Sequence, residues 1–193
     1  MKKNMKYSFL KKREYGFKKY SIVPLRKKDI QLVRKWRNEQ IDVLRQKTKL
    51  LHIDQIRYYK KLEKESFYKK NPEMILFSLL NNKKCIGYGG FVHIDWENKR
   101  AEISIITMTS RNEDLKIYEK DFTAFFYLIK KLAFDEIGFN RLTTETFDIR
   151  PYVIKLLEKI DFKFEGRMKE HIKINDEYVD SLIHACLKKD YIK

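Results

Sequence analysis

Polar residues that could share a reactive pocket lie in and beside one short apolar stretch. Glu102 sits within this alternating stretch, on the face opposite its apolar neighbours, and a carboxylate held in a strand can act as a general base. His93 and Asp95 end the preceding apolar stretch and could line the same pocket. The alternatives are a half-exposed Glu102 that pairs with Arg100 or a lysine, and solvated polar residues at the strand end.

Further candidates lie at the ends of expected helices. Arg37 and Asn38 follow Trp36, which continues an apolar stripe and is expected in the core. An arginine at a pocket mouth could hold a diphosphate through paired hydrogen bonds, although a surface arginine is an equal alternative. Tyr152 keeps its proton at neutral pH and could serve as a general acid.

The cysteines and the last histidines are expected to be structural. Cys85 and Cys186 each lie in an apolar run and show no Cys-x-x-Cys or histidine spacing, which argues against zinc, a redox motif or a disulfide. We expect buried free thiols in a reducing cytoplasm, and no metal site. His171 and His184 lie in the last predicted hairpin and are expected to be hydrogen-bonded structural residues.

Hydrophobic periodicity predicts the elements that position these residues. The expected strands span 20–25, 74–80, 85–94, 100–107, 142–147 and a final hairpin over 162–187, and the expected helices span 30–36, 52–67, 122–137 and 151–160. This order predicts one mixed α/β domain with a largely antiparallel sheet flanked by helices. The step from strand 100–107 through the long helix to strand 142–147 requires a parallel crossover.

Composition limits the class of protein. The chain has 193 residues, 43% of them apolar, with 43 Lys plus Arg against 27 Asp plus Glu and a net charge of +16. Because the lysines are spread along the chain, we attribute the charge to compositional bias and expect no nucleic-acid partner. No stretch reaches the ~18 apolar residues of a spanning helix, so we expect a cytoplasmic protein, and the sequence allows a homodimer. Residues 1–19 lack an apolar core for a secretory signal and are expected to form a basic arm before a domain over 20–193.

Several short motifs occur in fixed order between Tyr20 and Lys189. They are Trp36–Asn38, Gly87–Gly90, Trp96–Ser104, Gly138–Leu142, Lys155–Lys159, Phe162–Arg167 and Tyr178–Ser181. Their ordered set resembles the GNAT superfamily of N-acetyltransferases. Within it, the motifs are most similar to the branch that acts on nucleotide-linked amino sugars and on N-termini of ribosomal proteins.

The resemblance implies roles for several residues. It implies acetyl-CoA as the acyl donor, Glu102 as the base for an attacking amine, and backbone amides near Ile106 or Thr107 as donors to the oxyanion. Tyr152 would then reprotonate the leaving thiolate, and Arg150 would contact a donor phosphate, with capping of the fourth helix by Asp148 as the alternative explanation of that segment.

The chain departs from the family where the donor diphosphate should dock. Family members open the long helix with closely spaced glycines whose amides grip the diphosphate, whereas residues 109–118 contain no glycine. Two further departures place Asp161 where the family commonly has glycine, and Leu157 where some members carry a catalytic tyrosine. Either Arg111, Lys116 and Lys120 replace the amides, or the acyl donor differs, or the site is inactive.

Two classes of function therefore stay open. The first is an acyl-CoA-dependent N-acyltransferase that acetylates a small amine, such as an amino sugar on a nucleotide carrier, with a protein N-terminal acetyltransferase as the alternative acceptor class. The second is a non-catalytic module of the same fold that binds an anionic partner. Glu102 and the acceptor-side motifs favour the enzyme.

Overall fold

A computed structural model describes residues 6–191 of the chain. Within them, segments with alternating apolar residues fold as strands, and segments with apolar residues at helical spacing fold as helices. The elements in chain order are β1 (Tyr15–Phe17), β2 (Tyr20–Pro24), the 3-10 turn η1 (Lys27–Asp29), α1 (Ile30–Glu39), the 3-10 turn η2 (Ile41–Val43), α2 (His52–Glu65), β3 (Ile75–Asn81), β4 (Lys84–Asp95), β5 (Arg100–Thr107), α3 (Thr109–Asn112), α4 (Leu115–Lys131), the π-helical turn η3 (Leu132–Ile137), β6 (Arg141–Phe147), α5 (Pro151–Lys159), β7 (Lys163–Ile174), β8 (Glu177–Leu187) and α6 (Lys188–Tyr191).

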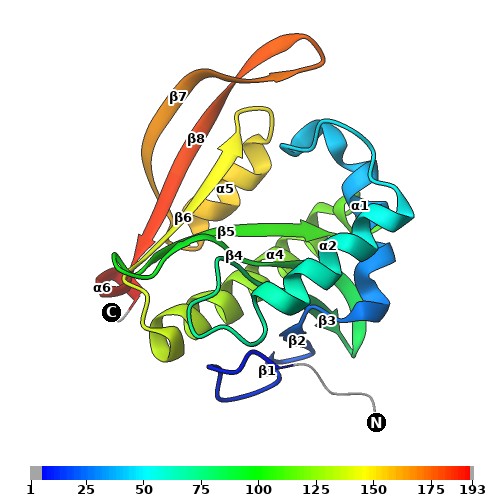
Figure 1. Ribbon diagram of the computed structural model, residues 1–193. Helices are drawn as coiled ribbons and strands as arrows, with labels where there is room; N and C mark the ends of the chain where they lie inside the picture. Colours follow the sequence, from blue (N-terminus) through cyan, green and yellow to red (C-terminus); the bar gives the residue numbers. More distant parts are fainter. Residues whose placement is uncertain (1–5, 192–193) are drawn as a thin grey trace.

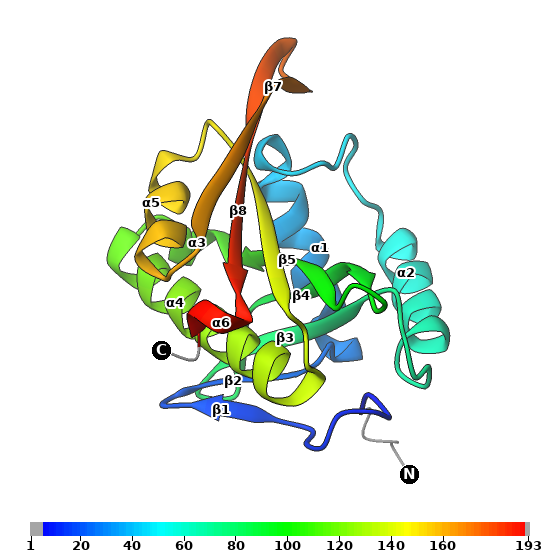
Figure 2. The ribbon, with the colours of Figure 1, turned by 90° about the vertical axis from the view of Figure 1, so that its left-hand side faces the viewer.

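The strands form one eight-stranded sheet in the order β1-β2-β3-β4-β5-β6-β8-β7. Its pairs are antiparallel except β5 with β6, so the predicted parallel crossover through α4 is confirmed. Helices α1 and α2 cover one side of the sheet, here called the α1 face, and α4 and α5 cover the other, the α4 face (Figure 2). The mixed, mostly antiparallel α/β architecture expected from the sequence is confirmed.

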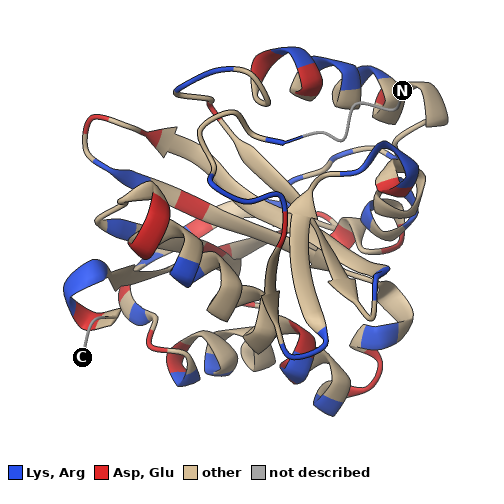
Figure 3. Ribbon diagram, turned by 90° about the horizontal axis from the view of Figure 1, so that it is seen from below, with Lys and Arg blue, Asp and Glu red and all other residues tan. Residues whose placement is uncertain are grey.

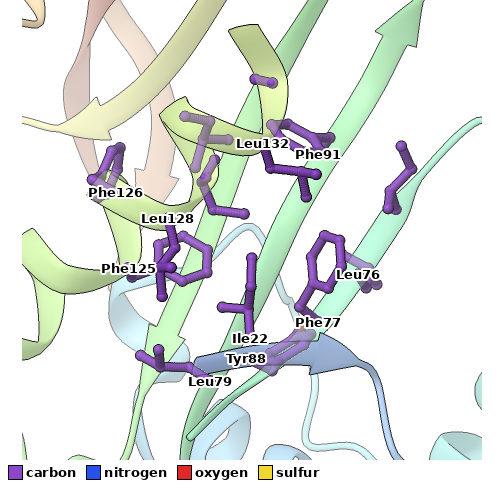
Figure 4. Packing of buried hydrophobic residues seen from close by; sticks show 14 of the residues in the cluster. Ile22, Leu76, Phe77, Leu79, Tyr88, Phe91, Phe125, Phe126, Leu128 and Leu132 are labelled. Carbon is purple, nitrogen blue, oxygen red and sulfur yellow. The ribbon is translucent and has the colours of Figure 1, made fainter. Parts of the chain in front are cut away.

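The core lies on both faces of the sheet, packed against α4 on one side and against α1 and α2 on the other. The expected stripe of Phe122, Phe125 and Phe126 is buried against the strands, as Figure 4 shows for the last two. Trp36 is buried as expected. The helical stretch ends at Gly138, whose φ of 84° is the left-handed conformation that glycine adopts without strain.

Glycines in β4 allow its close contact with neighbouring backbone. A Cβ at Gly89 would lie 2.2 Å from the Ser104 carbonyl oxygen and 2.8 Å from the Phe125 ring. A Cβ at Gly87 would lie 2.7 Å from the Ile106 carbonyl oxygen. Glycine at these positions therefore lets β4 and β5 approach each other under α4.

The N-terminal segment packs on the domain where it is described. Tyr7 and Leu10 are buried, and the Tyr7 hydroxyl donates to the Leu76 carbonyl at 2.8 Å. Strand β1 pairs with β2. The division into an arm over 1–19 and a domain over 20–193 stays a prediction, and residues 1–5 of that arm lie outside the described residues.

Asp29 and the two cysteines lie in or next to the core. Asp29 precedes α1 but makes no capping bond. Its carboxylate instead pairs with Arg26 and accepts from the Ser78 hydroxyl at 2.7 Å. Cys186 is buried and Cys85 is half-buried, both as free thiols. Burial raises the pKa of Cys85 to about 12, so this thiol stays protonated at neutral pH.

Lys and Arg occur on most elements, with Asp and Glu between them (Figure 3). Their distribution agrees with charge spread along the chain rather than gathered in one block. Among residues 6–191, no helix has the length and apolar character needed to cross a membrane. The same residues contain no cluster of His, Cys, Asp and Glu able to hold a metal ion.

Replacing Gly89 with alanine should lower the free energy of unfolding by about 1–3 kcal/mol, because its Cβ would meet strand backbone that cannot move aside cheaply. Chemical denaturation measures this change. Gly166→Ala is the matched control in β7, since its Cβ would have no heavy atom within 4 Å. Equal stabilities of the two variants would contradict this explanation.

Candidate active site

The central feature of the site is a fork in the sheet. Strands β5 and β6 pair only where Arg100–Glu102 lies beside Arg141–Thr143. Both strands continue, β5 to Thr107 and β6 to Phe147, but they diverge (Figure 1). Within the described chain, the β5 backbone groups that face β6 beyond the fork therefore lack a strand partner.

A cavity of about 180 Å³ fills this fork. Arg37 and Arg45 line it from the α1 face, whereas Tyr118, Phe122 and Leu157 line it from α4 and α5. The cavity is therefore lined by residues from both faces of the sheet. Two molecules entering from opposite faces could meet beside β5.

Glu102 lies at the fork itself and lines the cavity together with Arg37 and Arg45 of the α1 face. Its Oε2 lies 3.0 Å from Nδ1 of His93, and its Oε1 accepts a hydrogen bond from Arg45 at 3.2 Å. Its side chain is 21% exposed. The carboxylate is thus held in place while keeping access to the cavity. The alternative explanation, a pairing with Arg100, does not hold, because Arg100 bonds to Asp95.

Glu145 on β6 is a second carboxylate in the cavity wall, which sequence reasoning missed. Its side chain is 10% exposed, and its Oε2 accepts a hydrogen bond from Arg45. Its Oε1 is buried without a hydrogen-bond partner, and Nε2 of His171 lies 3.7 Å away. A buried carboxylate oxygen without a donor is costly in a folded protein. The only sequence signal was a charged residue inside the expected strand 142–147, which is otherwise uncharged.

Arg45 bridges Glu102 and Glu145 from the connection between α1 and α2. Asn38 fixes this connection, because its side-chain amide donates to the Leu50 carbonyl at 2.9 Å and accepts from the Leu50 backbone amide at 2.8 Å. Gln46 also donates to the Asn38 side chain. The predicted substrate residue Asn38 is therefore placed outside the cavity lining, where it holds the segment that carries Arg45.

Arg37, the other predicted acceptor-side residue, lines the cavity. Its guanidinium donates to the Gln46 side chain at 2.9 Å and to the Tyr88 hydroxyl at 2.7 Å. No carboxylate within residues 6–191 forms a salt bridge with it. Arg37 therefore presents a positive charge with only neutral partners on the α1 face.

His93 and Asp95 are separated by the structure. His93 contacts Glu102, as described, and its φ of 48° marks an irregularity in β4. Asp95 instead accepts from the backbone amide and side chain of Asn98, and these bonds hold the pKa of its carboxyl below the ordinary value. Asp95 thus organises the β4–β5 turn and is not among the residues that line the cavity.

The predicted oxyanion donors lie on the open part of β5. Ile106 lines the cavity, and Thr107 ends the strand. The Thr107 carbonyl accepts from the Gln40 side chain at 2.8 Å, which fixes the strand end against the α1–α2 connection. Their role as oxyanion donors stays a prediction.

The predicted donor cations are dispersed. Arg111 forms two hydrogen bonds, of 2.5 and 2.9 Å, with Asp121, whose side chain is fully buried and also accepts from Tyr20. Lys116 and Lys120 are exposed on α4 and do not line the cavity. Arg150 does line it. Of the four cations predicted at the donor end, Arg150 alone is thus placed in the cavity wall.

Tyr152 and Tyr118 lie side by side where α5 meets α4. The Tyr152 hydroxyl bonds to the Leu115 carbonyl at 3.1 Å and to Glu119 at 3.2 Å, outside the cavity lining. Desolvation and the Glu119 carboxylate raise the pKa of Tyr152, which keeps the proton on this hydroxyl. Its role as the acid stays a prediction. The buried Tyr118 lines the cavity instead and was not singled out from the sequence.

Arg111→Gln should lower the free energy of unfolding by about 3 kcal/mol, because it leaves the buried Asp121 carboxylate without its charged partner. Thermal and urea unfolding measure the change. Lys120→Gln is the control, since this exposed lysine lies on the same helix as Asp121. A stability of Arg111→Gln within 0.5 kcal/mol of the parent, a margin typical of surface substitutions, would show that the ion pair is dispensable.

Comparison with solved structures supports the fold. The spermidine N-acetyltransferase from Vibrio cholerae, crystallised with CoA and spermine, superposes with a TM-score of 0.75 at 15% identity, covering 91% of this chain and 99% of that one. A probable acetyltransferase of the GNAT family from Chromobacterium violaceum gives a TM-score of 0.75 at 12% identity, covering 97% and 92%. A GCN5-related N-acetyltransferase from Brucella melitensis gives 0.72 at 15% identity, covering 97% and 84%.

Comparison with curated proteins gives no match. The acetyltransferase (GNAT) domain family, in contrast, matches residues 22–183, most of the chain. The chain therefore belongs to the GNAT family and is an N-acetyltransferase, with acetyl-CoA as the acyl donor.

Proposed function

We propose that this acetyltransferase acts on a small primary amine that also carries an anionic group, such as a nucleotide-linked amino sugar. The observation that carries the proposal is the pair of carboxylates, Glu102 and Glu145, on the two sides of the fork. An amine reaches the enzyme as an ammonium ion at neutral pH, and two carboxylates around one opening suit that cation. The Oε1 of Glu145 makes no hydrogen bond within the described residues, so it is free to accept one from the ammonium N–H.

The position of Arg37 is the reason for proposing an anionic group on the acceptor. It lies on the same face as Glu102, lines the cavity, and has only neutral hydrogen-bond partners. Such a guanidinium binds phosphate or carboxylate well. A polyamine would instead bring several positive charges next to Arg37 and Arg45. The charge pattern favours the amino-sugar class, although a structurally similar enzyme is named for spermidine.

Different residues at the fork would then carry out different steps of the reaction. Acetyl-CoA supplies the acetyl thioester. Glu145 holds the ammonium, and Glu102 takes its proton, so that the neutral nitrogen attacks the thioester carbonyl. A C–N bond forms while the C–S bond breaks. Backbone amides of β5 near Ile106 and Thr107 would stabilise the negative charge on the carbonyl oxygen.

Glu102→Gln should lower turnover by ~10²- to 10⁴-fold, because the amide keeps the shape of the side chain but cannot take the proton. The residual rate should rise with pH, as more of the acceptor enters as the free amine.

Glu145→Gln should raise the acceptor KM more than it lowers kcat. Rates are measured from pH 6 to 9 with nucleotide-linked amino sugars, spermidine and peptides with free N-termini. Near-parental turnover of Glu102→Gln across this range would exclude Glu102 as the base, and preference for spermidine would overturn the proposed acceptor class.

Arg45→Gln should lower the acceptor KM about two- to fivefold, because the Arg45 guanidinium competes with the ammonium for both carboxylates. The effect is modest because the side chain is partly exposed, and exposed ion pairs contribute ~0.2–1 kcal/mol. Steady-state kinetics at saturating acetyl-CoA measure it. Lys47→Gln, an exposed position in the same connection, is the matched control. An increased KM in Arg45→Gln would mean that Arg45 assists the acceptor instead of competing with it.

A further inference from the structure

The α4 face of the cavity departs from the arrangement expected for a diphosphate. No glycine occurs between Gly90 and Gly138, so the segment from β5 into α4 contains none. This segment folds as the short helix α3, a capping residue and the first turn of α4. A turn of free backbone amides, which would receive a diphosphate, is therefore replaced by helix.

Asp114 occupies the first-turn amides of α4. Its Oδ1 accepts from the backbone amide of Lys116 at 2.8 Å and from that of Ile117 at 3.1 Å. A carboxylate that caps a helix uses the same donors and the same dipole that a bound phosphate would use. A phosphate at this helix end would also meet the negative charge of Asp114. The start of α4 therefore does not fit the diphosphate of acetyl-CoA.

The neighbouring cations do not restore that contact. Arg111 is held by the buried Asp121 carboxylate, and Lys116 and Lys120 point from exposed positions outside the cavity lining. Arg150 is different, because it lines the cavity and its guanidinium bonds to the Tyr118 hydroxyl at 3.3 Å. Within the described chain, Arg150 forms no salt bridge with a carboxylate.

The Tyr118 side chain fixes the position of this charge. It is 6% exposed, lies one turn into α4 and lines the cavity beside Phe122. Its hydroxyl accepts from Arg150 and retains its own proton, because burial raises its pKa. One guanidinium and one hydroxyl thus meet at the α4 side of the cavity, enough to hold a single phosphate.

We propose that this chain recognises its donor as a 4′-phosphopantetheine thioester. Arg150 and Tyr118 hold the phosphate next to the pantetheine arm, and the second phosphate and the nucleotide of acetyl-CoA gain no contact from the start of α4. The proposal rests on the acetyl transfer reaction but not on the identity of the acceptor. According to this proposal, Arg150 determines the affinity for the donor phosphate.

Calorimetric titration with CoA, 4′-phosphopantetheine and pantetheine tests this without any acceptor. We expect the Kd values of CoA and 4′-phosphopantetheine to agree within fivefold, and pantetheine to bind at least tenfold more weakly than either. A CoA affinity more than fivefold above that of 4′-phosphopantetheine would overturn the proposal, as would pantetheine binding less than tenfold weaker. Binding of none of the three would contradict acetyl-CoA as donor as well, whereas a failure of the acceptor screen alone would leave this result standing.

Variants separate the phosphate contact from general damage. Arg150→Gln should bring CoA and 4′-phosphopantetheine to the affinity of pantetheine, while Lys155→Gln, an exposed position on α5, should leave all three unchanged. Asp114→Ala frees the two α4 amides and should increase the preference for CoA over 4′-phosphopantetheine. Unchanged CoA affinity in Arg150→Gln, or an unchanged preference in an Asp114→Ala protein that melts cooperatively, would overturn the assignment.

Discussion

The early end of pairing between β5 and β6 is the constraint on which the rest of the structure depends. Two neighbouring strands normally satisfy each other's backbone groups along their whole length, but here the ladder stops at Glu102. Glu102 and its paired residue Thr143 point to the same face, and Glu145, two residues further along β6, points there too because side chains alternate. The divergence of the strands therefore creates the cavity and also places one carboxylate on each side of its opening.

The charged side chains around the fork come from elements on both faces of the sheet. Arg37 comes from α1 and Arg150 from the start of α5, so the two lie on opposite sides of the cavity, each with neutral hydrogen-bond partners. Between them, Arg45 forms ion pairs with both carboxylates, Glu102 and Glu145, and offsets one of their two negative charges. The arrangement is thus an arginine at each end of the cavity and two carboxylates in the middle. It suits a reaction between two substrates that each carry an anionic group away from the reacting atoms. The net charge of +16 on the whole chain adds long-range attraction for such substrates.

Much of the fold could be predicted from hydrophobic periodicity. The apolar residues at helical spacing in α4 and at alternate positions in β5 are the ones that the fold buries. Glu102 could be predicted for the same reason, as a carboxylate within a clear strand. Glu145 and Arg45 could not, since their meeting depends on strands and a connection that lie 100 residues apart in sequence. Arg111 was expected to meet a donor, but its partner Asp121 is buried by tertiary packing that a charge count does not reveal. Only the motif order, which carries the family resemblance, indicated that these segments converge.

The segment that leads into α4 also explains how the chain folds without the usual glycine turn. A glycine-rich anion loop leaves first-turn amides unbonded until a ligand arrives, whereas Asp114 bonds two of them within the protein. The buried Asp121 carboxylate is likewise satisfied by Arg111 and by the Tyr20 hydroxyl, which joins α3, α4 and β2. The carboxylates of Asp114 and Asp121 are thus both paired within the protein. The ordering of this corner therefore needs no bound phosphate, and on the α4 face Arg150 is the cation that lines the cavity without a carboxylate partner among residues 6–191.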